Sequence, residues 1–182
     1  MKLKLNNVRL AFPQLFEPST VNGEGKPAFS ACFLLSRTDP QVQGINQAMD
    51  QVAADKWGTK ADGVIKQMRA QDKVALHDGD LKSTYDGFPG NVYVSARSPT
   101  RILILDRDKS PLTEQDGRPY SGCYVNASIE IWAQDNAFGR RVNASLRGVQ
   151  FLRDGDAFSG GGAVGDDEFE DVSKSTTVDD LF

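Results

Sequence analysis

The chain has 182 residues, 39% of them hydrophobic, which is enough for one domain with a single core and some additional segments. No run approaches the eighteen apolar residues of a membrane-spanning helix, and the N-terminal MKLKLNNVRL alternates where a signal peptide would be continuously apolar, so we expect a soluble, intracellular protein with no membrane association. The net charge of −4 hides a division, because nine of the 25 acids but one of the 21 bases lie from Asp154 onward, which leaves a basic body with an acidic end.

Two strand patterns open the body. Residues 3–12 alternate between apolar and polar side chains until Pro13, which we expect to end the first strand. FSACFLLS at 29–36 is a dense apolar run typical of a second strand. Each cysteine, Cys32 and Cys123, lies among strand-like residues without C-x-x-C spacing, so we expect two reduced structural thiols.

A helical region interrupts the strands. Thr38 or Asp39 is the expected cap, Pro40 lies in the first turn, and apolar residues follow at helical spacing. These apolar positions are Ile45, Met49, Val52 and Trp57, and a second short helical piece is expected around Val64, Ile65 and Met68.

Four further strand patterns follow, at 91–98, 101–106, 122–133 and 140–152. Two strands, a helical insert and then at least four more strands do not fit alternating βαβ units. The order predicts a mainly β fold, a small OB-fold-like antiparallel barrel with a helical insert.

The composition changes near Ser159. SGGGAVG at 159–165 is typical of a flexible linker, and the acidic stretch beyond it has no helical or strand period. We therefore divide the chain into a body, residues 1–158, and an acidic tail, residues 159–182, expected to be disordered.

Catalytic constellations are sparse. His77 is the single histidine and its LHDGD context is typical of a turn. Acids cluster at 106–117 and 78–87, but the first has proline and glycine where an EF-hand needs glycine and glutamate, and the second has Lys82 at a ligand position. We expect no catalytic residue, no metal and no cofactor, hence no enzyme.

Aromatic and basic residues lie close together on the predicted strands and their loops. Proteins bind single-stranded nucleic acid by stacking bases on exposed rings while a cationic groove follows the phosphates. The candidate DNA-binding residues are Lys26, Arg37, Lys82, Tyr85, Phe88, Tyr93, Arg97, Arg101, Arg118, Tyr120, Phe138, Arg140 and Arg141. Among them Tyr85, Phe88, Tyr93 and Phe138 are the stacking candidates, because residues near turns can present a ring to a ligand.

Five stretches carry a resemblance to a known family. They are NNVRLAFPQLFEP (6–18), FSACFLLSR (29–37), YDGFPGNVYVSAR (85–97), YSGCYVNASIEIWAQDN (120–136) and VNASLRGVQFLRDGDAFSGG (142–161). Together they resemble a family of phage-encoded single-stranded DNA-binding proteins, long catalogued as a domain of unknown function. The resemblance implies one OB-fold that coats single strands during DNA replication, recombination and repair in the cytoplasm of an infected bacterium.

The tail resembles the ends of bacterial and phage single-stranded DNA-binding proteins, which close an acidic segment with phenylalanine. Here Leu181 stands where the bacterial pattern has proline. The resemblance implies that the tail recruits phage or host replication and recombination proteins, and a homodimer stays open. The residues concerned are Asp166, Asp167, Glu168, Glu170, Asp171, Asp179, Asp180, Leu181 and Phe182. A terminal ring and carboxylate can dock in an apolar pocket rimmed by bases, guided by upstream acids.

Two other classes of function stay open. A metal-dependent nuclease could use Asp106 and Asp108, provided that further carboxylates converge on them. A protein-interaction or assembly scaffold would show no salt-sensitive DNA binding.

Overall fold

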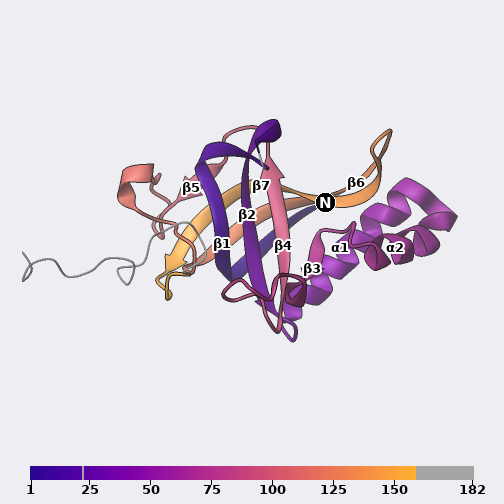
Figure 1. Cartoon of the computed structure of the whole chain (residues 1–182), viewed down its shortest axis with the longest axis horizontal. Coiled ribbons are helices and arrows are strands. Elements are labelled where there is room, and N and C mark those ends of the chain that lie inside the picture. Colours follow the sequence, from indigo (N-terminus) through magenta and orange to yellow (C-terminus); the bar gives the residue numbers. More distant parts are fainter. Residues whose placement is uncertain (22, 159–182) are drawn as a thin grey trace, which may run out of the picture.

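The computed structural model describes residues 1–21 and 23–158, which form a β-barrel with two helices beside it (Figure 1). The expectations for 159–182 therefore lie outside the described residues, and the domain boundary near Ser159 stays a prediction. The strands are β1 (Lys2–Val21), β2 (Glu24–Ser36), β3 (Leu76–Asp78), β4 (Asn91–Ser98), β5 (Leu103–Leu105), β6 (Tyr124–Asn136) and β7 (Gly139–Arg153). The helices are α1 (Pro40–Trp57) and α2 (Ala61–Ala70), with short 3₁₀ turns η1 (Gly58–Lys60), η2 (Gly79–Lys82) and η3 (Glu114–Asp116).

Five strands close the predicted barrel. Strands β4, β2, β1, β6 and β7 pair in that order, each antiparallel to the next, and β4 then pairs with β7. This closing pair is parallel and consists of Arg97 opposite Ser145, and β5 also runs parallel to β7. The mainly β barrel with its helical insert is confirmed, and the pairs that β7 makes with β4 and β5 add a parallel component to the otherwise antiparallel ladder.

Pro13 does not end the first strand, contrary to the sequence prediction. Strand β1 continues to Val21, but its register with β2 shifts between Ala11 and Gln14. Phe12 and Pro13 lie between these two residues, and Phe12 has a positive φ of 48°. Proline lacks an N–H and is tolerated at a bulge, where the ladder is already interrupted. Strand β1 therefore passes through an irregularity at Pro13 and continues beyond it.

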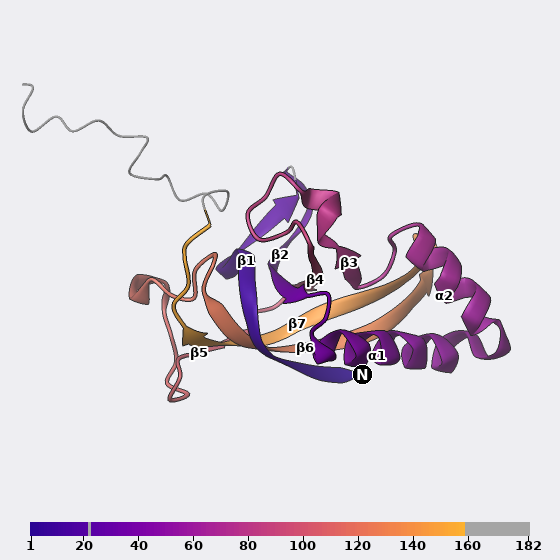
Figure 2. The same cartoon turned by 90° about the horizontal axis from the view of Figure 1, so that it is seen from below.

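Helix α1 begins as the sequence predicts. The side chain of Asp39 accepts a hydrogen bond from the Gln41 N–H at 2.9 Å, and Pro40 occupies the first turn. Ile45, Ala48, Met49 and Ala53 are its buried residues. Figure 2 shows α1 lying along the β6–β7 hairpin, with α2 folded back beside it. None of the helices in the described part of the chain is long and apolar enough to cross a membrane.

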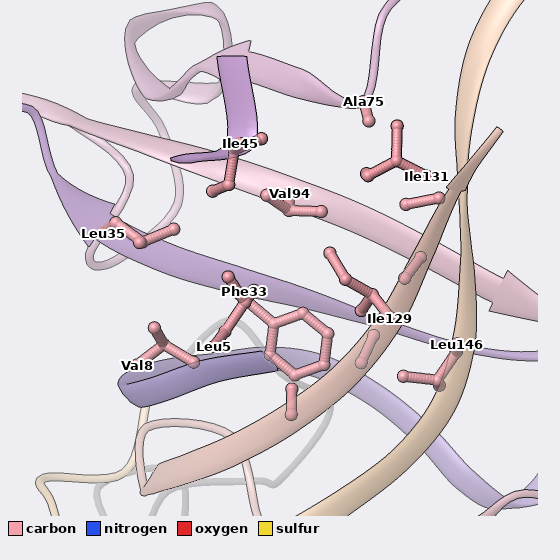
Figure 3. Packing of buried hydrophobic residues seen from close by; sticks show 14 of the residues in the cluster. Leu5, Val8, Phe33, Leu35, Ile45, Ala75, Val94, Ile129, Ile131 and Leu146 are labelled. Carbon is pink, nitrogen blue, oxygen red and sulfur yellow. The ribbon is translucent and has the colours of Figure 1, made fainter. Parts of the chain in front are cut away.

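The barrel interior is filled by alternate residues of its strands. Phe33 and Val94 are fully buried, and Figure 3 shows them facing Ile129 from across the barrel. Cys32, Leu34 and Tyr93 alternate with these inward residues, so they face outward. They are nevertheless buried, because the segment between β3 and β4 folds over them.

This covering creates a second apolar cluster on the outer face of β1, β2 and β4. We call it the outer cluster, and its buried members are Ala11, Cys32, Leu34, Phe88, Tyr93 and Phe158. Cys32 and Cys123 are both free and buried, as expected for reduced structural thiols. Burial is the main cause that raises the pKa of the Cys123 thiol, to about 11.

The last described residues are fastened to the barrel. The Tyr120 hydroxyl donates to Asp154 at 2.6 Å, and the Phe158 N–H donates to the Ser121 carbonyl at 3.1 Å. The Arg9 guanidinium lies 4.2 Å from the centre of the Phe158 ring. These contacts therefore anchor Phe158, the last described residue, to the barrel.

Candidate nucleic-acid interface

A groove of about 530 Å³ opens where β4 and β7 meet. Its residues come from the start of β2, from the segment entering β3, from β4 and from the two facing strands of the β6–β7 hairpin. We call it the basic groove. It is lined by Lys26, Pro27, Ala28, Val74, Ala75, His77, Ser95, Arg97, Pro99, Trp132, Gln134, Arg141, Val142, Asn143, Ala144 and Ser145.

The groove exists because β4 and β7 pair only at Arg97 and Ser145. On the hairpin side of this pair, the Val142 N–H donates instead to the carbonyl of Lys73 at 3.1 Å. The hairpin thus separates from β4 while staying attached to the segment before β3. The small side chains of lining residues such as Ala75 and Ala144 leave the space between the hairpin and β4 unfilled.

Three basic residues bring positive charge to the groove. Lys26, Arg97 and Arg141 come from β2, β4 and β7, and all three are exposed. No aspartate or glutamate is among the lining residues. Cationic side chains without an interleaved acid raise the local positive potential, which favours a polyanion. These three residues were sequence candidates, and the fold brings them together.

Trp132 supplies an aromatic ring to the same groove. It is 41% exposed, and its indole N–H donates to the Ser145 hydroxyl at 2.9 Å, which fixes the ring across the hairpin. The sequence candidates did not include Trp132. Its alternation with the buried Ile129 and Ile131 along β6 was the available signal, because it places residue 132 on the outer face.

Phe138 lies at the tip of the β6–β7 hairpin and is 91% exposed. The adjoining Arg140 has its Nε 3.5 Å from the Asp135 carboxylate. Figure 1 shows this hairpin reaching beyond the barrel, which agrees with the high exposure of Phe138 at its tip. The expected exposure of Phe138 is therefore found.

Two of the four stacking candidates are instead buried. Phe88 is 0% exposed and Tyr93 is 4% exposed, with their ring centres 5.0 Å apart in the outer cluster. Burial is the main cause that raises the pKa of Tyr93 to about 12, and the His77 ring stacks on it at 4.9 Å. The expectation that these rings lie open to bases is corrected, because the segment before β4 covers them. Tyr85 stays 41% exposed, edge-on to Phe12.

The remaining basic candidates do not line the basic groove. Arg37 forms ion pairs with Asp78 and Asp80. The Lys82 ammonium lies 5.7 Å from the centre of the Tyr93 ring, and the Arg101 guanidinium lies 5.9 Å from the centre of the Phe29 ring. Arg118 forms an ion pair with the Asp106 carboxylate at 2.5 Å. Tyr120 is likewise outside, since its hydroxyl fastens Asp154. Their roles in DNA binding stay predictions.

The carboxylates considered for a metal-dependent nuclease serve the fold. Hydrogen bonding from Arg118 lowers the pKa of Asp106, and hydrogen bonding from Ser110 lowers that of Asp108. Over residues 1–21 and 23–158, no three His, Cys, Asp or Glu side chains gather as a metal site. The converging carboxylates that the nuclease alternative requires are not found there.

Comparisons with known proteins agree on one family. A family model described as "Enterobacter phage Enc34, ssDNA-binding protein" matches residues 1–182. The chain is 52% identical over 177 residues to "Putative protein p50" of Acyrthosiphon pisum secondary endosymbiont phage 1, covering 95% of each chain.

Solved structures show the same fold. The single-stranded DNA-binding protein of bacteriophage Enc34, solved in complex with ssDNA, superimposes with a TM-score of 0.72 at 23% identity, over 86% of this chain and 88% of that one. The gp2.5 single-stranded DNA-binding protein of bacteriophage T7 gives a TM-score of 0.59 at 10% identity, over 97% and 99%.

The different exposures of the rings generate a stability prediction. Replacing Phe88 with alanine should lower the free energy of unfolding by about 3–5 kcal/mol, because it empties the middle of the outer cluster. Replacing the half-exposed Tyr85 with alanine should cost much less. Urea denaturation of both variants measures the difference, and equal stability losses would contradict the assignment of Phe88 to the core.

Proposed function

The chain belongs to the Enterobacter phage Enc34 ssDNA-binding protein family, and from this membership we propose that it binds single-stranded DNA in the basic groove. The observation that carries the proposal is the convergence of Lys26, Arg97 and Arg141 around an exposed tryptophan, with no acid in the lining. These are the two elements that single-strand binding needs, a cationic path and a stacking ring.

The position of the groove supports the same function. OB-folds bind oligonucleotides on the face of their second and third barrel strands, between the loop that joins strands 1 and 2 and the loop that joins strands 4 and 5. The corresponding elements here are β2 and β4, flanked by the β1–β2 and β6–β7 hairpins. The basic groove draws its residues from β2, β4, β6 and β7, so it lies at the binding position of the fold.

In the proposed complex, Lys26, Arg97 and Arg141 neutralise successive phosphates, while a base stacks on Trp132. Phe138 and Arg140, at the projecting tip of the hairpin, extend this path beyond the groove. The Trp132–Ser145 hydrogen bond keeps the indole from rotating, so less side-chain entropy is lost when a base stacks. Nothing in this binding mode requires a metal or a cofactor.

We propose further that the protein coats and protects single strands during phage DNA replication and recombination in the cytoplasm of the infected cell. The acidic tail is proposed to recruit replication and recombination proteins through Leu181 and Phe182, and its acids to compete with DNA phosphates. The charge division of the chain supports this competition, because the acids of the tail follow a basic body. A homodimer is compatible with this role.

The charge of the groove predicts a specific salt response. On single strands, the logarithm of affinity falls with the logarithm of salt by about 0.7 per neutralised phosphate. Replacing Arg97 or Arg141 with glutamine should weaken binding to oligo-dT and reduce this slope by about 0.7. Fluorescence anisotropy at several salt concentrations measures both quantities.

A matched pair of lysine variants tests whether the change in salt dependence requires a residue of the basic groove. Lys26→Gln removes a lysine from the groove, whereas Lys66→Gln removes an exposed lysine from α2, outside it. The first variant should lower the slope and the second should leave it unchanged. Equal slopes in wild type and all groove variants would overturn the proposed binding site.

The two tryptophans allow the stacking ring to be tested directly. Trp57 lies on α1 with its indole N–H bonded to Asp135, and Trp132 lies in the groove. Single-stranded DNA should quench the fluorescence of Trp57→Phe, which retains Trp132, but not that of Trp132→Phe. Trp132→Ala should weaken binding by about 1–3 kcal/mol. Quenching that persists without Trp132 would refute its contact with bases.

The competition model predicts an effect of removing the acids. A protein ending at Gly165 should bind oligo-dT more tightly than the full chain at low salt, and the advantage should disappear as salt screens both polyanions. Deleting Phe182 alone should leave DNA affinity nearly unchanged but abolish capture of replication or recombination partners. Equal affinity of the Gly165-truncated and full-length proteins at low salt would rule out competition.

A further inference from the structure

A second groove, of about 340 Å³, lies on the outside of the barrel between the beginning of β1 and β5, over β6 and β7. We call it the leucine groove, after Leu3, Leu103 and Leu105 in its lining. Leu103 is 61% exposed, and Leu3 and Leu105 are partly buried. The described residues thus leave aliphatic surface open to solvent at this position.

The leucine groove is formed by ordered parts of the fold. Ser128 and Gly148 face each other across β6 and β7, and these small residues leave a depression. A side chain at position 148 would begin 3.1 Å from the Leu103 carbonyl oxygen, so glycine lets β5 pack closely. The Gln150 amide donates to the carbonyls of Asp106 and Arg107 at 3.4 and 3.3 Å, which holds the turn after β5.

The lining suits an anionic segment with aliphatic or aromatic side chains. Lys2 and Lys4 lie beside the leucines, and the lining contains neither an acid nor an aromatic ring. Bases stack on aromatic rings, so the leucine groove is a poor continuation of a DNA path. The Glu130–Arg147 pair, at 3.4 Å, also lies between Ser128 of this groove and Trp132 of the basic groove along β6.

We propose that the leucine groove binds the C-terminal end of the same chain, Asp179–Phe182. Leu181 and Phe182 supply the apolar side chains, while Asp179, Asp180 and the terminal carboxylate complement Lys2 and Lys4. The 24 residues after Phe158 span up to about 80 Å when extended, so the end of the chain can reach the groove. Docking there withholds Phe182 from a partner until the partner competes for it.

Photo-crosslinking in the full-length protein tests this contact without DNA, so the result is independent of the basic groove. Phe182 is replaced with benzoylphenylalanine, and irradiation products are mapped by mass spectrometry. We expect crosslinks within the same chain to residues 2–4, 103–105, 126–128 or 148–150. Crosslinks concentrated at Arg97, Trp132 or Arg141, crosslinks mainly between chains, or no internal crosslink would each overturn the proposal.

Two leucine substitutions provide a matched control. Leu103→Ser alters the leucine groove, whereas Leu81→Ser alters a leucine of nearly equal exposure, 63% against 61%, that does not line it. Leu103→Ser should reduce the crosslink yield at least fivefold, and Leu81→Ser should leave it unchanged. Thermal denaturation of both variants verifies that the fold is intact. Equal yields in the two variants would refute docking at Leu103.

Discussion

The closure of the barrel by one parallel residue pair is the constraint on which the candidate interface depends. Arg97 and Ser145 join β4 to β7, and the hairpin then separates from β4. A longer ladder would continue the pairing into the space where the groove opens. Because the closure is short, Arg97 faces solvent at the junction and Arg141 lies further along the separated strand. Closure and binding surface are therefore consequences of the same arrangement.

The division of aromatic rings between stability and binding follows from how the outer face is covered. The segment between β3 and β4 uses Phe88 to cover Tyr93, and Phe158 joins them from the end of the body. These rings cannot meet a base without opening the cluster. Trp132 and Phe138 lie on the projecting hairpin, which this segment does not cover. The buried rings of the outer cluster therefore stabilise the fold, whereas the rings of Trp132 and Phe138 are accessible to a ligand.

The basic residues divide in a similar way. Arg37 and Arg118 are engaged with aspartates, which lowers the pKa of Asp78 and of Asp106 and reduces the positive potential that these arginines present. In the described part of the chain no ion pair joins Lys26, Arg97 or Arg141 to an acid, so their charges stay available to a polyanion. Formal charge along the sequence does not reveal this difference, because it depends on which acids the fold places beside each arginine.

The sequence by itself determined the features that depend on neighbouring residues. Asp39 and Pro40 define a helix start through local capping, the alternation at 91–98 defines a strand, and the ordered motifs of the body identify the family. Only the tertiary structure decided which face of a strand is covered and which distant residues meet. Tyr93 and Trp132 both lie on outward-facing strand positions, yet a folded segment buries the first and leaves the second exposed. Lys26, Arg97 and Arg141 are far apart in the chain, and long-range strand pairing brings them to one groove, which local patterns do not encode.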